Sequence, residues 1–199
     1  MQKYEYDDTY KVLYRSTRKT PFFVDVPPMH YITYNGKGHP SGPDFQEACN
    51  SLFSLSYTLK FKVARPKGFD YKVNPMEVSW FLDKKDGTID FTWKAMIMQP
   101  ACISHTDFCR ALEISRKLGK DISYEKLQFE EIDFGRCVQC FHPGDYNAMN
   151  ATMYRMQDFA RENGLAFDPY THDIYLNDSR KTKAENLKAI MRIGVHHKK

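Results

Sequence analysis

The pattern of apolar and polar positions along the chain predicts three amphipathic helices. Apolar residues recur three or four positions apart within 44–60, 104–119 and 149–162. Residues at this spacing lie on one face of an α-helix, so each stretch presents a stripe for burial. Ser104 is a capping residue at the start of the second helix, and Gly119 is a stop signal at its end.

Segments rich in β-branched and aromatic residues surround these helices and predict strands. The expected strands are 31–34, 76–81, 89–99, 129–141, 172–178 and 187–195. Lys84 to Gly87 has the composition of a hairpin turn between the second and third of these strands. We interpret residues 35–43, which contain three glycines, as a loop without a phosphate-binding motif.

The same order of elements occurs twice: strand, glycine-containing turn, helix, strand, strand. Residues 29–100 form the first module and residues 129–195 the second, with a connecting helical region at 101–128. A small antiparallel sheet that packs a helix on one face needs a cover for its other face, and a twin sheet is the natural cover. We therefore predict an α+β fold, a tandem duplication of a strand–helix–strand–strand module. Its two antiparallel sheets would form a central cleft with the helices outside.

The chain of 199 residues is long enough for one large domain. We expect a single domain from residue 21 to residue 199. The residues before it, 1–20, read as an arm, in which Asp7 and Asp8 cap a short helix that runs through Arg15.

Each module carries one carboxylate in a comparable strand. Glu77 shares a strand face with Ser79 and Phe81, and Asp173 shares one with Tyr175, because side chains alternate along a strand. A carboxylate among aromatic residues is costly unless it is solvated or paired. The placement leaves three interpretations open. The acids are exposed or paired with Lys94, Lys188 or Arg192 of the following strands, or they hold a cation, or they act as a base on water with a pKa raised by burial.

Aromatic residues make up 15% of the chain, which is high and suits both cores and small-molecule pockets. Five of them lie on or near the two acidic strands and are candidate ligand contacts beside Glu77 and Asp173: Trp80, Phe81, Trp93, Tyr146 and Tyr175. Aromatic faces attract cations. Strand alternation places Trp80 on the face opposite to Glu77.

Charge and cysteine content limit the classes of function. The net charge of +4 does not require a nucleic-acid partner, and no apolar run is long enough to span a membrane. Five cysteines without a secretory leader indicate reduced thiols in a cytoplasmic protein. Cys137 and Cys140 form a C-x-x-C, which we interpret as two small core residues rather than a redox or zinc site, so we expect no metal and no cofactor.

Three motifs resemble the stand-alone branch of the GyrI-like small-molecule-binding family. Residues 75–81, Pro-Met-Glu-Val-Ser-Trp-Phe, resemble its P-L-E-G-L-W-W pattern, with Ser79 in place of leucine. Residues 142–146 match H-x-G-x-Y, and residues 172–180 resemble H-E-I-Y-L-S-D-P-R, with Asp173 where glutamate is usual. The resemblance extends from Pro21 to Val195.

This resemblance implies a tandem of two strand–helix–strand–strand modules that binds bulky aromatic or hydrophobic molecules, including cationic ones, in an acidic cleft. It also implies an alternative, a hydrolase that opens the cyclopropane of genotoxic compounds. There Glu77 or Asp173 would activate water, and Tyr146 or Tyr175 would steady the leaving oxygen. A third alternative is a module that inhibits a protein partner such as gyrase.

Overall fold

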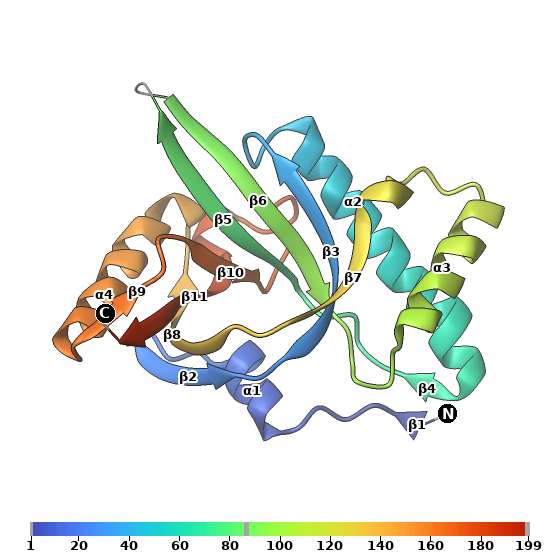
Figure 1. The fold of residues 1–199 in the computed structure, drawn as a ribbon, viewed down its shortest axis with the longest axis horizontal. Coiled ribbons are helices and arrows are strands. Elements are labelled where there is room, and N and C mark those ends of the chain that lie inside the picture. The colour runs from blue at the N-terminus through green and yellow to red at the C-terminus, as the bar shows by residue number, and fades with distance from the viewer. Residues whose placement is uncertain (1, 86–87, 198–199) are drawn as a thin grey trace. The chain divides into compact units, whose positions relative to one another are not determined.

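The computed structural model describes residues 2–85 and 88–197, without the side chains of residues 83–90. The described residues form helices and mainly antiparallel strands (Figure 1) and divide into two compact units. Unit 1 comprises Met1–Glu5, Met29–Met76 and Leu82–Ile132, and unit 2 comprises Tyr6–Pro28, Glu77–Phe81 and Asp133–Lys199. The strand β5 (Met76–Lys85) is therefore divided between the two units.

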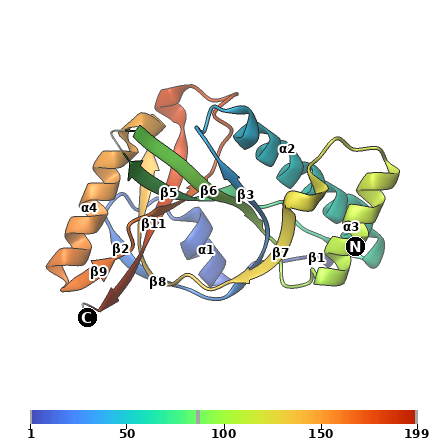
Figure 2. The ribbon, with the colours of Figure 1, turned by 45° about the horizontal axis from the view of Figure 1, so that its top comes forward.

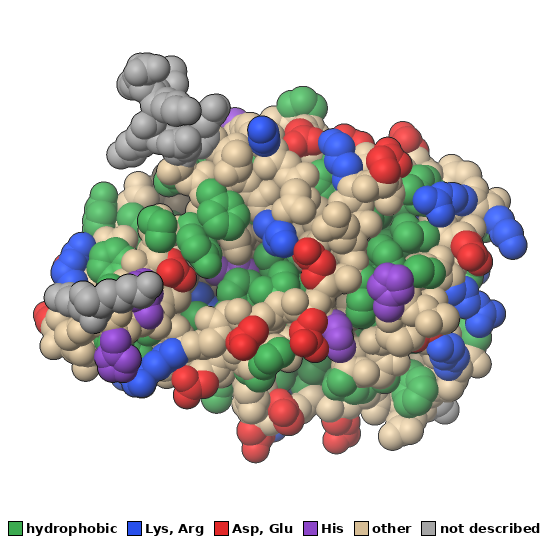
Figure 3. All heavy atoms as spheres, in the orientation of Figure 1, with side chains coloured by type: hydrophobic (Ala, Val, Ile, Leu, Met, Phe, Trp, Pro, Cys, Tyr) green, Lys and Arg blue, Asp and Glu red, His purple; other side chains and the backbone are tan. Residues whose placement is uncertain are grey.

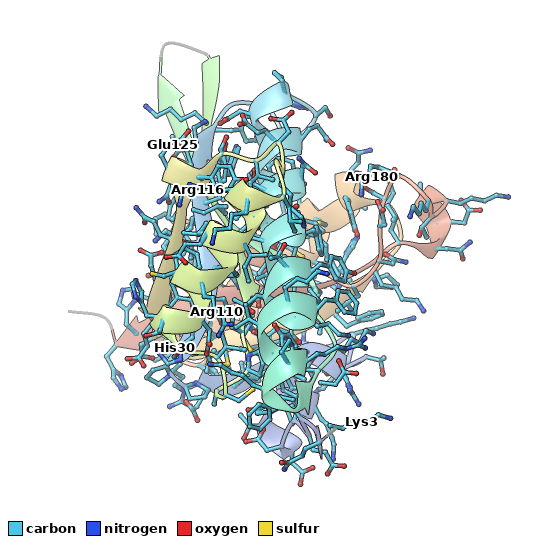
Figure 4. All side chains as sticks on the ribbon, turned by 90° about the vertical axis from the view of Figure 1, so that its right-hand side faces the viewer. Lys3, His30, Arg110, Arg116, Glu125 and Arg180 are labelled. Carbon is cyan, nitrogen blue, oxygen red and sulfur yellow. The ribbon has the colours of Figure 1, made fainter. Side chains whose placement is uncertain are left out.

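Unit 1 pairs its strands in the order β5-β6-β3-β7 and packs two helices side by side (Figure 4). Its elements are β1 (Gln2–Lys3), β3 (Met29–Lys37), α2 (Pro43–Thr58), a π-helical segment (Leu59–Ala64), short 3-10 turns (Arg65–Lys67 and Tyr124–Lys126), β4 (Phe69–Asp70), β6 (Thr88–Met98), α3 (His105–Lys117) and β7 (Leu127–Ile132). β1 and β4 pair in parallel, separately from the larger sheet.

Unit 2 pairs its strands in the order β2-β8-β11-β10-β5, and β9 adds to the end of β11. Its elements are α1 (Asp8–Arg15), β2 (Phe22–Val26), β8 (Gly135–Pro143), α4 (Met149–Glu162), β9 (Leu165–Phe167), β10 (Thr171–Tyr175), β11 (Lys188–His197) and 3-10 turns (Tyr146–Ala148 and Ala184–Asn186). Figure 2 shows α4 running along the strands of this unit. Met156 and Ala160 of α4 pack against Val138, Cys140, Met191 and Ile193 in the core.

The α+β class and the two strand–helix–strand–strand repeats are confirmed. The first repeat is β3, α2, β5, β6, and the second is β8, α4, β10, β11. The short helix of the arm is present, with Asp7 as its cap: the Asp7 carboxylate accepts a hydrogen bond from the Tyr10 amide at 2.9 Å. The capping box of Ser104 and Asp107 also forms at the start of α3. The predicted central cleft stays a prediction, and part of the expected hairpin turn at 84–87 lies outside the described residues.

The loop expected at 35–43 begins later than predicted, because β3 continues through Asn35 and Gly36 to Lys37. Gly36 pairs with Trp93 of β6, and the Trp93 indole lies over the glycine Cα. A side chain at position 36 would occupy the place of this ring, so the glycine serves close packing within a strand here rather than a turn.

Gly36→Ala should therefore destabilise unit 1 by about 1–3 kcal/mol, because the added Cβ would lie 2.1 Å from a Trp93 ring atom. Urea denaturation measures the loss. The double variant Gly36→Ala with Trp93→Phe should recover part of it, since the smaller ring leaves room for the methyl group. Additive losses from the two substitutions would contradict this packing.

On the face drawn in Figure 3, acidic and basic side chains are interspersed, with hydrophobic side chains between them. The described residues of that face thus show no basic stripe of the kind that follows a nucleic-acid backbone. A membrane crossing by helix is also ruled out for the described part of the chain, where every helix is too short or too polar.

Candidate functional site

Strand register in unit 2 sorts the polar side chains of the sheet onto two faces. Asp173 lies opposite Met191, which lies opposite Cys140, and these residues share the face that packs on α4. His172 lies opposite Arg192, which lies opposite Gln139. Because neighbouring residues of a strand point to opposite sides, this second set lies on the other face. We call the two sides the α4 face and the α1 face, since α1 contacts the second set.

On the α4 face, four side chains form what we call the Asp173 cluster: Trp80, Tyr146, Asp173 and Tyr175. The Trp80 indole Nε1 donates a hydrogen bond to the Tyr175 hydroxyl at 3.0 Å. The Tyr146 and Tyr175 rings lie 5.1 Å apart, tilted against each other. The cluster thus joins an acid to aromatic residues from β5, β10 and the turn before α4.

The Asp173 carboxyl is poorly satisfied for a buried group. It is 5% exposed, and its Oδ2 accepts only a long hydrogen bond, 3.5 Å, from the Thr171 hydroxyl. Its Oδ1 has no hydrogen-bond partner among the described residues, and the same holds for the buried Tyr146 hydroxyl. Buried polar atoms in proteins are nearly always paired, so two unpaired ones in one cluster require an explanation.

Burial sets the electrostatics of this cluster. It raises the pKa of Asp173 to about 7, with the Thr171 hydroxyl opposing the shift only in part. Burial also raises the pKa of Tyr146 to about 12, and the negative charge of Asp173 adds to this. Near neutral pH the Asp173 carboxyl therefore exchanges between a neutral acid and an anion, and Tyr146 keeps its proton as a donor.

On the α1 face, Glu77 is fully buried and well satisfied. Its Oε1 accepts a hydrogen bond from the Tyr14 hydroxyl at 2.8 Å, and its Oε2 lies 2.7 Å from His172 Nε2. The Arg192 guanidinium is also close, with Nη1 3.9 Å from Oε2. Glu77 thus has the partners that keep a buried carboxylate stable.

Two polar side chains of the sheet hold the last turn of α1 on this face. Arg192 Nη2 donates to the Leu13 carbonyl at 2.6 Å, and Gln139 Nε2 donates to the Val12 carbonyl at 2.9 Å. Arg192 Nε also donates to Gln139 Oε1 at 2.8 Å. The last carbonyls of a helix lack partners within the helix and favour a cation, so these contacts both satisfy and fix α1.

His172 connects Glu77 to a hydroxyl. Its Nδ1 lies 3.0 Å from Ser79 Oγ, and its ring lies 4.3 Å from the Phe134 ring. Burial lowers the pKa of His172, which favours the neutral imidazole despite the adjacent carboxylate.

The structure thus brings together four of the seven candidate residues, all of them in unit 2. Trp80, Tyr146, Asp173 and Tyr175 share one cluster, whereas Glu77 lies on the opposite face of the same sheet. Phe81 is 39% exposed and contacts the Tyr170 ring at 4.8 Å. Trp93 is buried in unit 1, where it packs against Tyr34 and Phe45.

Sequence reasoning missed most partners of Glu77. The sequence pattern offers Arg192 as a cross-strand partner of an acid, but it does not connect Tyr14 or His172 with Glu77. One signal was available, since His172 and Arg192 are polar residues within otherwise apolar strands, where an unpaired polar side chain is costly. Nothing in the pattern connects Tyr14 with residue 77, 63 positions away.

Cys137 and Cys140 are both buried and free, in agreement with the interpretation as core residues. Residues three apart on a strand point to opposite faces, so the two thiols do not face each other. Burial raises the pKa of Cys137 to about 11, which makes its thiol unreactive. No group of three or more metal-ligand side chains lies together within residues 2–85 and 88–197.

Comparison with known proteins identifies a family. The model of the GyrI-like small molecule binding domain matches residues 19–196. No curated protein sequence matches the chain.

Solved structures share the fold over nearly the whole chain. An uncharacterised conserved protein from Listeria innocua is 28% identical, with a TM-score of 0.85, and the match covers 94% of this chain and 98% of that one. A structure described as a hydrolase from Listeria innocua is 29% identical, with a TM-score of 0.83 and the same coverage. The EcmrR C-terminal domain matches at 8% identity and a TM-score of 0.57, covering 90% of this chain and 98% of its own, and is similar in fold alone.

Proposed function

The chain belongs to the GyrI-like small-molecule-binding family, and we propose that it binds bulky aromatic cations through the Asp173 cluster of unit 2. The aromatic part of the ligand would lie against Trp80, Tyr146 and Tyr175. Its positive charge would lie beside the Asp173 carboxylate, and a polar group of the ligand would accept a hydrogen bond from the Tyr146 hydroxyl.

The unpaired Oδ1 of Asp173 is the observation that carries this proposal. A buried carboxyl with one unpaired oxygen and one long hydrogen bond costs free energy in the unliganded protein. A ligand cation would remove that cost by pairing with the anion, and the tyrosine and tryptophan rings add attraction for a cation at short range. The proposal therefore explains the two unpaired atoms and the aromatic surroundings together.

A pair of ligands with one shape and different charge tests the proposal. N-methylquinolinium and 1-methylnaphthalene have nearly the same size, and only the first is cationic. A ligand that binds the folded state raises the melting temperature by mass action, so the cation should stabilise the wild type more than its neutral analogue does. Asp173→Asn should abolish this difference, because the amide cannot pair with a cation. Equal stabilisation of wild type and Asp173→Asn by the cation would contradict the proposal.

Tyr146→Phe should leave the stability of the free protein within about 0.5 kcal/mol, since the lost hydroxyl has no partner among the described residues. The same substitution should weaken binding of ligands that carry a hydrogen-bond acceptor, such as N-methylquinolinone. Tyr154→Phe is the matched control, because Tyr154 is an exposed residue of α4. Melting curves with and without ligand measure both effects. Identical ligand shifts for the two variants would remove Tyr146 from the site.

A second candidate function is hydrolysis, and two observations favour it. Two similar structures at 28% and 29% identity are described as hydrolases. The Asp173 pKa near 7 also suits a general base at neutral pH. In this alternative, Asp173 takes a proton from water as the water oxygen bonds to a ring carbon of a cyclopropyl ketone. The strained ring C–C bond breaks, its electron pair forms the enolate of the ketone, and the enolate then takes the proton back from Asp173, so that the product is the substrate plus one water.

Mass spectrometry of an aryl cyclopropyl ketone incubated with the protein tests turnover. The expected product is heavier by one water molecule, it forms catalytically with wild type, and it forms at least about 100-fold more slowly with Asp173→Asn. Stabilisation by the ketone without any product would leave binding as the function and reject hydrolysis.

A further inference from the structure

The α1 face carries a second constellation, which the aromatic-cation proposal does not use. We propose that Ser79, His172 and Glu77 form a nucleophilic relay in which Ser79 attacks small aryl esters. The relay lies on the opposite side of the sheet from the Asp173 cluster. Its activity would thus be a function separate from ligand binding at that cluster.

The contacts define the direction of the relay. Glu77 Oε2 lies 2.7 Å from His172 Nε2, and the Glu77 carboxylate already accepts a hydrogen bond from the Tyr14 hydroxyl and lies near the Arg192 guanidinium. A carboxylate in such surroundings accepts, so His172 Nε2 carries the ring proton. The imidazole is neutral, hence Nδ1 is unprotonated and accepts the hydrogen bond of Ser79 Oγ over 3.0 Å. Serine, histidine and carboxylate therefore stand in the order that nucleophilic catalysis needs.

The strand geometry holds the three groups in place without a loop. Glu77 and Ser79 are two residues apart on β5 and share one face, and His172 extends from β10 between them. The Phe134 ring packs on the imidazole at 4.3 Å and fixes its orientation. An imidazole beside its hydroxyl distinguishes Ser79 from the buried Ser56, whose Oγ has no partner among the described residues.

Burial along the strand indicates where a substrate would approach. Glu77 is 0% exposed, Ser79 is 3% exposed, and Phe81, the next residue on the same face, is 39% exposed. The Phe81 ring contacts the Tyr170 ring at the exposed end of this row. Residues two apart on a strand are separated by about 7 Å, which is within the length of a small aryl ester. The aryl ring would lie against Phe81 and Tyr170, with the ester carbonyl directed to Ser79.

The reaction balances with water as the only second reactant. Ser79 Oγ forms a bond to the carbonyl carbon while its proton passes to His172 Nδ1. The aryl oxygen then leaves, breaking its bond to that carbon, and takes the proton from Nδ1. Water attacks the acyl-serine in the same way, releasing the carboxylic acid and restoring Ser79. Glu77 stabilises the imidazolium that forms in each half of the cycle.

Covalent labelling of the full chain tests the relay. An aryl fluorophosphonate should add one label per molecule, and peptide mapping should place the label on Ser79. The label should be absent from Ser79→Ala. His172→Gln should react at least about 100-fold more slowly, because the base is lost. Ser56→Ala, which removes a buried hydroxyl from unit 1, should be labelled at the wild-type rate.

The steady-state rate of p-nitrophenyl acetate hydrolysis, measured on the same proteins, should change among the variants as the labelling rate does. If the folded wild-type protein carries no label on Ser79, that result alone overturns the proposal, and no variant is needed to interpret it. Labelling of Ser79 at an unchanged rate in a folded His172→Gln variant, verified by circular dichroism, would overturn the role of the histidine. The covalent label reports on Ser79 directly and does not depend on ligand binding at Asp173. A negative labelling result would therefore reject the relay without affecting the proposed cation site.

Discussion

Arg192→Met should lower the free energy of unfolding by about 3–5 kcal/mol, because it removes one partner of a buried charged network. The Arg192 side chain contacts Glu77, the Gln139 amide and the Leu13 carbonyl. Methionine fills much of the same volume but leaves the Glu77 charge and the end of α1 with fewer partners. Urea denaturation measures the loss, and amide hydrogen exchange within α1 should accelerate more than exchange within α4.

Arg161→Met is the matched control for this prediction. Arg161 is exposed on α4 and pairs with Asp158 three residues earlier. Surface pairs of this kind contribute little, so the loss should stay below about 1 kcal/mol. If both arginine variants lose the same stability, the network on the α1 face does not hold α1 in place.

Asp173→Asn should make the stability of the protein less dependent on pH between about 4 and 7. Burial raises the pKa of Asp173 from 3.8 to about 7 in the folded state. The folded protein therefore holds its proton more tightly than the unfolded chain does. Folding is favoured at low pH, and stability falls as the unfolded chain loses this proton above pH 4, until the folded state also loses it near pH 7. Asparagine does not titrate in this range, so the stability of the variant should not fall in this way between pH 4 and pH 7.

The difference in unfolding free energy between variant and wild type should accordingly shift in favour of the variant by at most about 4 kcal/mol from pH 4 to pH 8. Urea unfolding at several pH values measures it. Asp158→Asn, an exposed position on α4, should show no comparable shift. A difference between Asp173→Asn and wild type that stays constant with pH would show that Asp173 titrates normally in the folded protein.

Local signals made most of the fold predictable from the sequence. Asp7 and Ser104 mark helix starts because capping depends on residues within one turn, and both caps form. Hydrophobic spacing located α2, α3 and α4, since each buries one stripe. The end of β3 was not predictable in this way, because the reason for Gly36 in a strand is the Trp93 ring, 57 positions later in the chain.

In the candidate site, too, the features that depend on neighbouring residues were predictable from the sequence, and those that depend on distant residues were not. Asp173 and Tyr175 share a face because strand alternation is local, and this placement was predicted. Their separation from Glu77 depends on the register of the strands and on which helix covers each face of the sheet. The spacing of residues along the chain predicts neither of these. Near-symmetry of the two modules suggested that both acids serve one site, whereas the contacts place Glu77 in a satisfied network and leave Asp173 short of partners.

The release of a proton on binding is the most direct test of the Asp173 cluster as a cation site. At pH 6 the Asp173 carboxyl is mostly protonated, so pairing with a cation must displace its proton. Titration calorimetry with N-methylquinolinium in two buffers of different ionisation enthalpy measures this. We expect nearly one proton released per bound ligand by wild type at pH 6, far less at pH 8.5, and none by Asp173→Asn. Binding to wild type at pH 6 without proton release would show that the cation does not pair with Asp173, which would contradict the proposed function.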